Sequence, residues 1–142
     1  MTTETVVVEL SRRIDATPER VFDAWFDAKA LGRWLFATPD GEMERVEVDP
    51  RVGGRFEIDE RRGDEVARHW GTYVEIDRPR RLVFDFATSF SDEPTRIIVT
   101  IAPDGDGSLV TLRHEGVWAD FEERTRHGWG MILDNLARTL GA

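Results

Sequence analysis

Residues 118–140 read WADFEERTRHGWGMILDNLARTL, and this stretch decides how the rest of the chain folds. Its apolar side chains recur at steps of three and four residues, which is the period of an amphipathic helix. The expected apolar face consists of Trp118, Phe121, Trp129, Ile132, Leu133, Leu136 and Leu140, with Thr125 as a polar residue inside it. Asp120 and Glu123 have the spacing of a capping box, and Gly141 is placed as a C-cap glycine. A helix with this apolar face needs another layer to cover it.

The chain before this helix is predicted to form strands in close succession. Short runs of alternating apolar and polar residues, separated by tight turns, are typical of antiparallel strands with one buried face. The expected strands are 5–14, 43–48, 55–61, 67–76, 82–86, 95–102 and 109–115. The segment Val52-Gly53-Gly54, before the third of them, is expected to form a bulge or tight turn that needs positive φ. Within 67–76, Trp70 and Thr72 are expected to face the helix, and His69 is expected on the outer face.

Two short helices are predicted between the first two strands. Thr17 followed by Pro18 is typical of a helix start, and Asp27 is a second N-cap before residues 28–35. Helices this short are expected to close one end of the sheet. We therefore expect a single α+β domain over residues 1–142, in which a curved antiparallel sheet of about six to seven strands wraps around the long C-terminal helix.

The composition sets limits on the class of protein. An apolar fraction of 40% and a charged fraction of 33% are typical of a soluble globular domain. The formal net charge of -9 argues against non-specific binding to nucleic acid or to anionic membranes. The chain has no cysteine, no recognisable signal peptide and no apolar run of ~20 residues that would cross a bilayer. We expect a cytoplasmic protein without membrane insertion.

Several stretches resemble one family in the family's own order, and together they cover nearly the whole chain. These are residues 14–25 (IDATPERVFDAW), 31–35 (LGRWL), 52–56 (VGGRF), 71–76 (GTYVEI), 79–84 (PRRLVF), 128–129 (GW) and 133–136 (LDNL). The chain resembles the heat-shock-protein-90 ATPase activator homologues, within the START-like (Bet v 1-like) superfamily. The resemblance implies a helix-grip fold with a cavity between the sheet and the long helix. The superfamily contains lipid and hormone binders, polyketide cyclases and co-chaperone domains.

Candidate ligand contacts are the polar and aromatic residues predicted to face that cavity. His114 stands out because an imidazole can bind a ligand or act as a general base near neutral pH. The alternative is a core histidine whose two ring nitrogens are both hydrogen-bonded. An apolar pocket with a few polar groups is typical of a small-molecule site, but the same aromatic residues also suit an ordinary core. The candidates are Trp25, Trp34, Phe56, Trp70, Thr72, Phe84, His114, Phe121, Thr125 and Trp129.

Three functions stay open at this stage. The first is the binding of a small hydrophobic molecule, without a cofactor and without a metal. The second is a cyclase- or hydrolase-like enzyme that uses His114 or Glu60, although the sequence holds no nucleophile elbow, P-loop or metal-ligand spacing. The third is a stand-alone co-chaperone-like domain that contacts a chaperone. Exposed edge strands allow a homodimer as well as a monomer.

Overall fold

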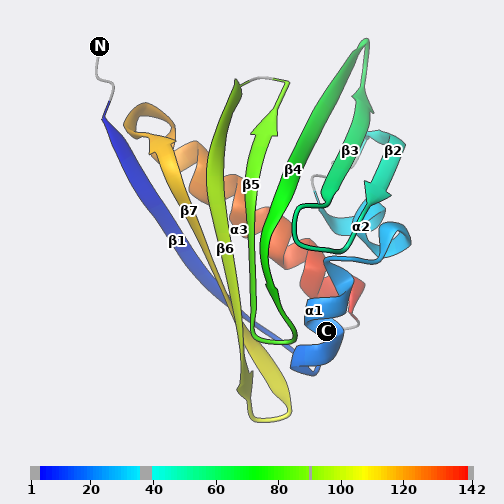
Figure 1. The fold of residues 1–142 in the computed structure, drawn as a ribbon, viewed down its shortest axis with the longest axis vertical. Helices are drawn as coiled ribbons and strands as arrows, with labels where there is room; N and C mark the ends of the chain where they lie inside the picture. The colour runs from blue at the N-terminus through cyan, green and yellow to red at the C-terminus, as the bar shows by residue number, and fades with distance from the viewer. Residues whose placement is uncertain (1–3, 36–39, 90, 141–142) are drawn as a thin grey trace.

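The computed structural model of the chain describes residues 4–35, 40–89 and 91–140, and Figure 1 shows their arrangement. The elements in chain order are β1 (Thr5–Ile14), α1 (Pro18–Ala24), α2 (Ala28–Trp34), β2 (Glu42–Val48), β3 (Arg55–Arg62), β4 (Glu65–Asp77), β5 (Arg81–Thr88), β6 (Ser91–Asp104), β7 (Gly107–Trp118), the 3-10 turn η1 (Ala119–Phe121) and α3 (Glu122–Thr139). The expected order of one strand, two short helices, six strands and one long helix is confirmed.

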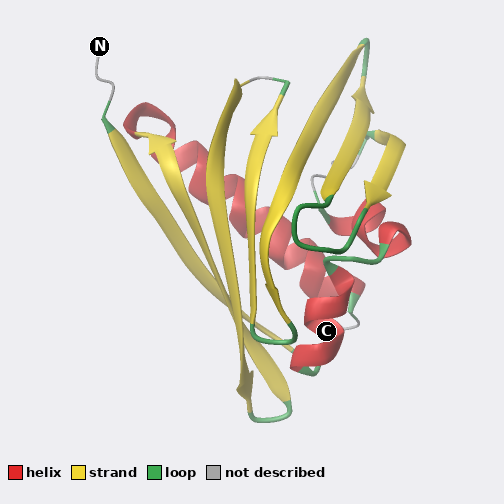
Figure 2. Ribbon diagram, in the orientation of Figure 1, coloured by secondary structure: helices red, strands yellow, loops and turns green. Residues whose placement is uncertain are grey.

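The strands form one antiparallel sheet in the order β1-β7-β6-β5-β4-β3-β2. From β2 to β7 each strand pairs with the next one in the chain, and β1 joins the sheet beside β7. The helices all lie on one side of the curved sheet (Figure 2), and α3 crosses it diagonally from the end of β7 toward α1 and α2 (Figure 1). This is the α+β, helix-grip arrangement that the sequence predicts.

The core lies between α3 and the inner face of the sheet. On α3, Trp129, Leu133 and Leu136 are buried, and their spacing of four and three places them on one helical face. On the sheet, the inner side chains Phe84, Ile97, Val99, Val110 and Leu112 are buried against them. Each such burial contributes about 1.5–3 kcal/mol, so this packing buries the apolar faces that the sequence pattern predicts.

The two short helices begin at the predicted caps. The Thr17 hydroxyl accepts a hydrogen bond from the backbone N–H of Arg20 at 3.4 Å, and the Asp27 carboxylate accepts one from Lys29 at 3.0 Å. Each cap contributes about 1 kcal/mol. The turn before β3 also behaves as predicted, because Gly53 has φ 86°, which favours glycine.

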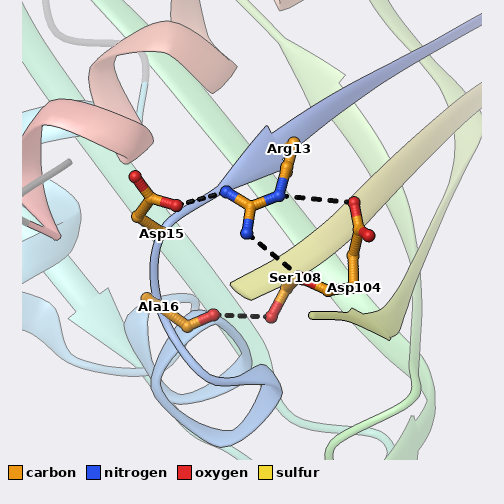
Figure 3. Close-up of polar contacts among 5 residues, drawn as sticks. All are labelled: Arg13, Asp15, Ala16, Asp104 and Ser108. Atoms are coloured by element: carbon orange, nitrogen blue, oxygen red, sulfur yellow. Dashed lines mark hydrogen bonds and ion pairs between the residues drawn. The ribbon is translucent and has the colours of Figure 1, made fainter. Parts of the chain in front are cut away.

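Polar contacts anchor the connection from β1 to α1 onto the β6–β7 hairpin (Figure 3). The buried Ser108 hydroxyl donates to the carbonyl oxygen of Ala16 at 2.7 Å. Arg13 pairs with Asp15 and reaches Asp104, whose carboxylate lies 3.4 Å from Arg13 Nε. These contacts hold the start of α1 at one end of the sheet.

The long helix begins later than predicted. Trp118 ends β7, where it pairs with Thr5 of β1, and α3 starts only at Glu122. The N-cap residue of α3 is Phe121, which makes no side-chain cap bond, so the predicted Asp120–Glu123 capping box is wrong. The apolar period assigns Trp118 to the helix, but its pairing with β1 makes it the last residue of β7. Gly141, the predicted C-cap, lies outside the described residues.

The predicted faces of β4 are reversed. His69 and Tyr73 are buried, whereas Thr72 is exposed and Trp70 is half-buried, so the expected inward orientation of Trp70 and Thr72 is wrong. A β-bulge shifts the register after Tyr73, and Ile76 packs against the core as Tyr73 does. Counting back from Ile76 in steps of two therefore assigns the wrong face to every residue before the bulge.

Candidate functional site

A pocket of about 420 Å³ lies between the start of α3 and the neighbouring ends of β5, β6 and β7. Its lining residues are Phe86, Ala87, Thr88, Thr95, His114, Gly116, Val117, Trp118, Phe121, Arg124 and Thr125. Trp118 and Phe121 keep 40% and 47% of their surface exposed, so the pocket opens to solvent on their side. This volume is within the range of ~300–1,000 Å³ that is usual for small-molecule sites.

The first turn of α3 and the end of β7 shape the opening of the pocket. Phe121, Arg124 and Thr125 line it together because residues three and four apart share one helical face. Gly116 lines it from β7 with φ 83°, a conformation that favours glycine. A Cβ atom at Gly116 would meet the methyl group of Thr95 at 3.5 Å, an ordinary contact, so the positive φ rather than lack of space favours glycine here.

Two polar groups of the pocket wall, His114 and Thr95, belong to one directed chain of hydrogen bonds. Trp129 Nε1 donates to His114 Nδ1 at 3.0 Å, and His114 Nε2 lies 2.7 Å from Thr95 Oγ1. An indole nitrogen can only donate, so Nδ1 of His114 carries no proton and the neutral ring holds its proton on Nε2. His114 therefore donates to Thr95, whose hydroxyl donates in turn to the carbonyl oxygen of Phe86 at 3.3 Å.

This series of hydrogen bonds makes His114 a poor general base. Burial lowers the pKa of His114 from 6.5 to about 4, so the imidazole is neutral at physiological pH. Its only acceptor nitrogen is already bonded to Trp129, and a substrate proton cannot reach Nδ1 without breaking that bond. The geometry fits the alternative expectation of a core histidine with both ring nitrogens satisfied, here with its ring forming part of the pocket wall.

A second buried polar group lies on β3 and β4 and does not line the pocket. Glu60 is 1% exposed, and its carboxylate accepts from Arg62 Nε at 2.6 Å. Burial and the positive charge of Arg62 lower the pKa of His69 to about 4. The His69 ring stacks on Phe86, with ring centroids 6.2 Å apart, and the T-shaped contact of Phe86 with His114 measures 6.0 Å. Phe86 thus separates the two buried histidines.

The predicted site residues divide into separate groups. Only His114, Phe121 and Thr125 line the pocket, and Trp129 is buried and bonded to His114. Trp70 and Thr72 lie on the outer face of the sheet. The remaining four pack together beside α1 and α2, where the space lined by three of them is only about 10 Å³. These four are Trp25, Trp34, Phe56 and Phe84.

Several pocket residues are absent from the sequence-based set. Arg124 had a signal, because it lies three residues after Phe121 and one before Thr125. Phe86 had one too, since it continues the alternation of Phe84 on β5. Thr95 had none, because its bond to His114 depends on how β6 and β7 align. The alignment between strands is set by their pairing, which the alternation of a single strand does not fix.

Within residues 4–35, 40–89 and 91–140, no group of three or more His, Asp or Glu residues is placed to hold a metal ion. In the same part of the chain, no helix is long and apolar enough to cross a membrane.

The sheet, the gripped C-terminal helix and the pocket between them define a helix-grip protein. The family described as "Activator of Hsp90 ATPase homolog 1-like protein" matches residues 15–141, and the chain belongs to this family. None of the curated proteins matches the sequence.

Solved structures of the same fold come from several bacteria. The crystal structure of a Chromobacterium violaceum protein is 26% identical with a TM-score of 0.85, and the alignment covers 96% of this chain and 98% of that one. The solution structure of an AHSA1-like protein from Aeromonas hydrophila is also 26% identical, with a TM-score of 0.80 and coverage of 94% and 91%. A Staphylococcus aureus protein of unknown function shares the fold at 16% identity and a TM-score of 0.86, with coverage of 96% and 94%.

Proposed function

We propose that this protein binds a small, largely apolar molecule in the pocket between α3 and the ends of β5, β6 and β7. The observation that carries the proposal is a pocket of about 420 Å³ in which few polar side chains interrupt an apolar wall. Phe86 and Val117 are buried residues whose side chains form the inner apolar wall of the pocket. Trp118 and Phe121 extend this wall to the opening. Covering such a surface with an apolar ligand gains about 25 cal/mol per Å².

The two alternative functions receive less support from the site. An enzyme that uses His114 as a base would need the nitrogen that Trp129 occupies, and one that uses Glu60 would need a carboxylate that is buried and paired with Arg62. A co-chaperone role is suggested by the description of the family, and it stays a prediction. A cytoplasmic location likewise stays a prediction.

The test is to fill the pocket and measure ligand binding. Thr125→Phe places a ring into the pocket from α3, and Thr72→Phe makes the same substitution on the outer face of the sheet as a matched control. We expect 1-decanol to raise the melting temperature of the wild type and of Thr72→Phe by mass action, and to have little effect on Thr125→Phe. Native mass spectrometry of the purified protein gives the stoichiometry of any molecule retained from the cell. Equal stabilisation of both variants would contradict binding in this pocket.

A further inference from the structure

We infer that the ligand of this pocket carries a single acidic group, and that Arg124 at the opening binds it. The inference rests on the proposed function, since it assigns a chemical class to the molecule bound there. That class is a free apolar acid, with an apolar body inside the pocket and a carboxylate at its mouth.

The first argument is the charge of the pocket wall. The chain as a whole is acidic, with 28 Asp and Glu residues against 19 Lys and Arg residues. The described residues that line the pocket nevertheless include no acidic residue, and among them Arg124 alone carries a formal charge. His114 adds none, because burial keeps its imidazole neutral at physiological pH. The opening therefore presents a positive charge on an otherwise acidic molecule, which favours an anion.

The second argument is the set of contacts that Arg124 makes. Many arginines of this chain are paired with carboxylates; Arg126, two residues further along α3, lies 3.4 Å from Glu122. Arg124 instead stacks over the ring of Phe121, 5.5 Å from its centroid. No carboxylate among the described side chains lies within ion-pair distance of its guanidinium. Stacking on a ring leaves the N–H groups at the edge of the guanidinium able to donate, and their fork matches a carboxylate.

The third argument is the gradient of burial across the pocket. Phe86, His114 and Val117 are buried, whereas Phe121 and Arg124 are exposed at the opening. A ligand that fills this shape has its apolar part against the buried residues and its charged group beside Arg124. A carboxylate held at the opening also keeps part of its hydration, so its binding avoids the full desolvation cost of a buried ion pair.

The test compares decanoate with 1-decanol, which share a chain length and differ in charge. The quantity measured is the ratio of their dissociation constants, obtained from Trp fluorescence or calorimetry with the full chain. Arg124→Met removes the charge and keeps the aliphatic stem, and Arg33→Met is a matched control on α2. We expect Arg124→Met to weaken decanoate by about five- to tenfold and to leave 1-decanol nearly unchanged. Added salt should weaken decanoate in the wild type more than in the variant.

Each outcome separates the inference from the function on which it rests. Both probes could bind while Arg124→Met changes neither the ratio of their dissociation constants nor its salt dependence. In that case the assignment of an acidic group to the ligand is wrong, and apolar binding stands. Equal weakening of both probes would assign Arg124 a packing role and would also overturn the inference. If neither probe binds, the proposed function fails, and the inference fails with it. Arg124→Lys keeps the charge but not the fork, so it should retain part of the preference, which guards against a folding defect in the Met variant.

Discussion

The space between the sheet and α3 is filled at one end and open at the other. Beside α1 and α2, Trp25 and Trp34 pack edge to face at 4.7 Å, and the remaining gap of about 10 Å³ is too small for a ligand. At the start of α3 the same two layers enclose about 420 Å³. Aromatic residues are present at both ends, so their number does not decide whether a cavity forms.

The difference lies in what covers each end. At the filled end, two capped helices carry indole rings into the sheet, and both Trp25 and Trp34 are buried. At the open end, the described elements that cover the sheet are η1 and the first turn of α3, and Phe121 is 47% exposed. The filled end is therefore expected to determine stability and the open end to determine binding.

The largest expected effect is at the filled end. Trp34 is fully buried, and Trp34→Ala should lower the free energy of unfolding by about 3–5 kcal/mol, because the removed ring leaves a cavity that its rigid neighbours cannot close. Urea denaturation measures this directly. Trp34→Phe is the matched control and should cost clearly less, since the indole nitrogen of Trp34 has no hydrogen-bond partner among the described residues. A loss below about 1 kcal/mol for Trp34→Ala would contradict the picture of a tightly packed end.

The fold was predictable because each element has a local signal. The spacing of Trp129, Leu133 and Leu136 predicts the helix, and the side chains of Thr17 and Asp27 mark where α1 and α2 begin. The two predictions that were wrong depend on non-local contacts. The face of β4 depends on a bulge in its pairing with β5, and the start of α3 depends on the pairing of Trp118 with β1.

The site was predictable only in part, for a related reason. An inward-facing aromatic residue can either line a cavity or fill it, and the sequence pattern is the same in both cases. Trp34 fills the space because α2 brings it into contact with Trp25, whereas Phe121 lines the pocket and stays 47% exposed. The placement of α2 against the sheet is a tertiary feature that no local pattern reports.

The next expected effect is a dependence of stability on pH. Burial holds the pKa of His69 and of His114 at about 4, while the unfolded chain has the ordinary value of 6.5. Below about pH 6.5 the unfolded state binds protons that the folded state does not, so stability falls as the pH falls toward about 4. From about pH 7 to pH 5 each histidine should cost about 2 kcal/mol.

A substitution at the open end isolates one of the two contributions. His114→Gln retains an acceptor for Trp129 and a donor for Thr95 but does not titrate, so its loss of stability over the same pH range should be smaller than that of the wild type. Denaturation curves across the pH range measure the difference. Parallel curves for wild type and His114→Gln would show that His114 is protonated as easily in the folded chain as in the unfolded one.

A Trp→Phe substitution made at both ends should give different results. Trp129→Phe removes the donor to His114 Nδ1 and leaves a buried acceptor unpaired, at a cost of about 1–3 kcal/mol. It should also raise the pKa of His114 from about 4, because Nδ1 can then accept a proton without breaking a bond. Titration of the His114 ring by NMR measures this rise. Trp34→Phe removes no hydrogen bond and should leave that pKa where it is, so equal titration curves in the two variants would contradict the directed chain.

The smallest expected effect on stability is at the pocket opening. Phe121→Ala should change the free energy of unfolding by only about 0.5 kcal/mol, because nearly half of the side chain is already exposed. Its effect on binding should be larger, since the ring supplies apolar wall and the surface on which Arg124 stacks. We therefore expect Phe121→Ala to weaken both 1-decanol and decanoate, in contrast to Arg124→Met, which should weaken decanoate alone. A strong loss of stability with unchanged binding would reverse the roles assigned to the two ends of the molecule.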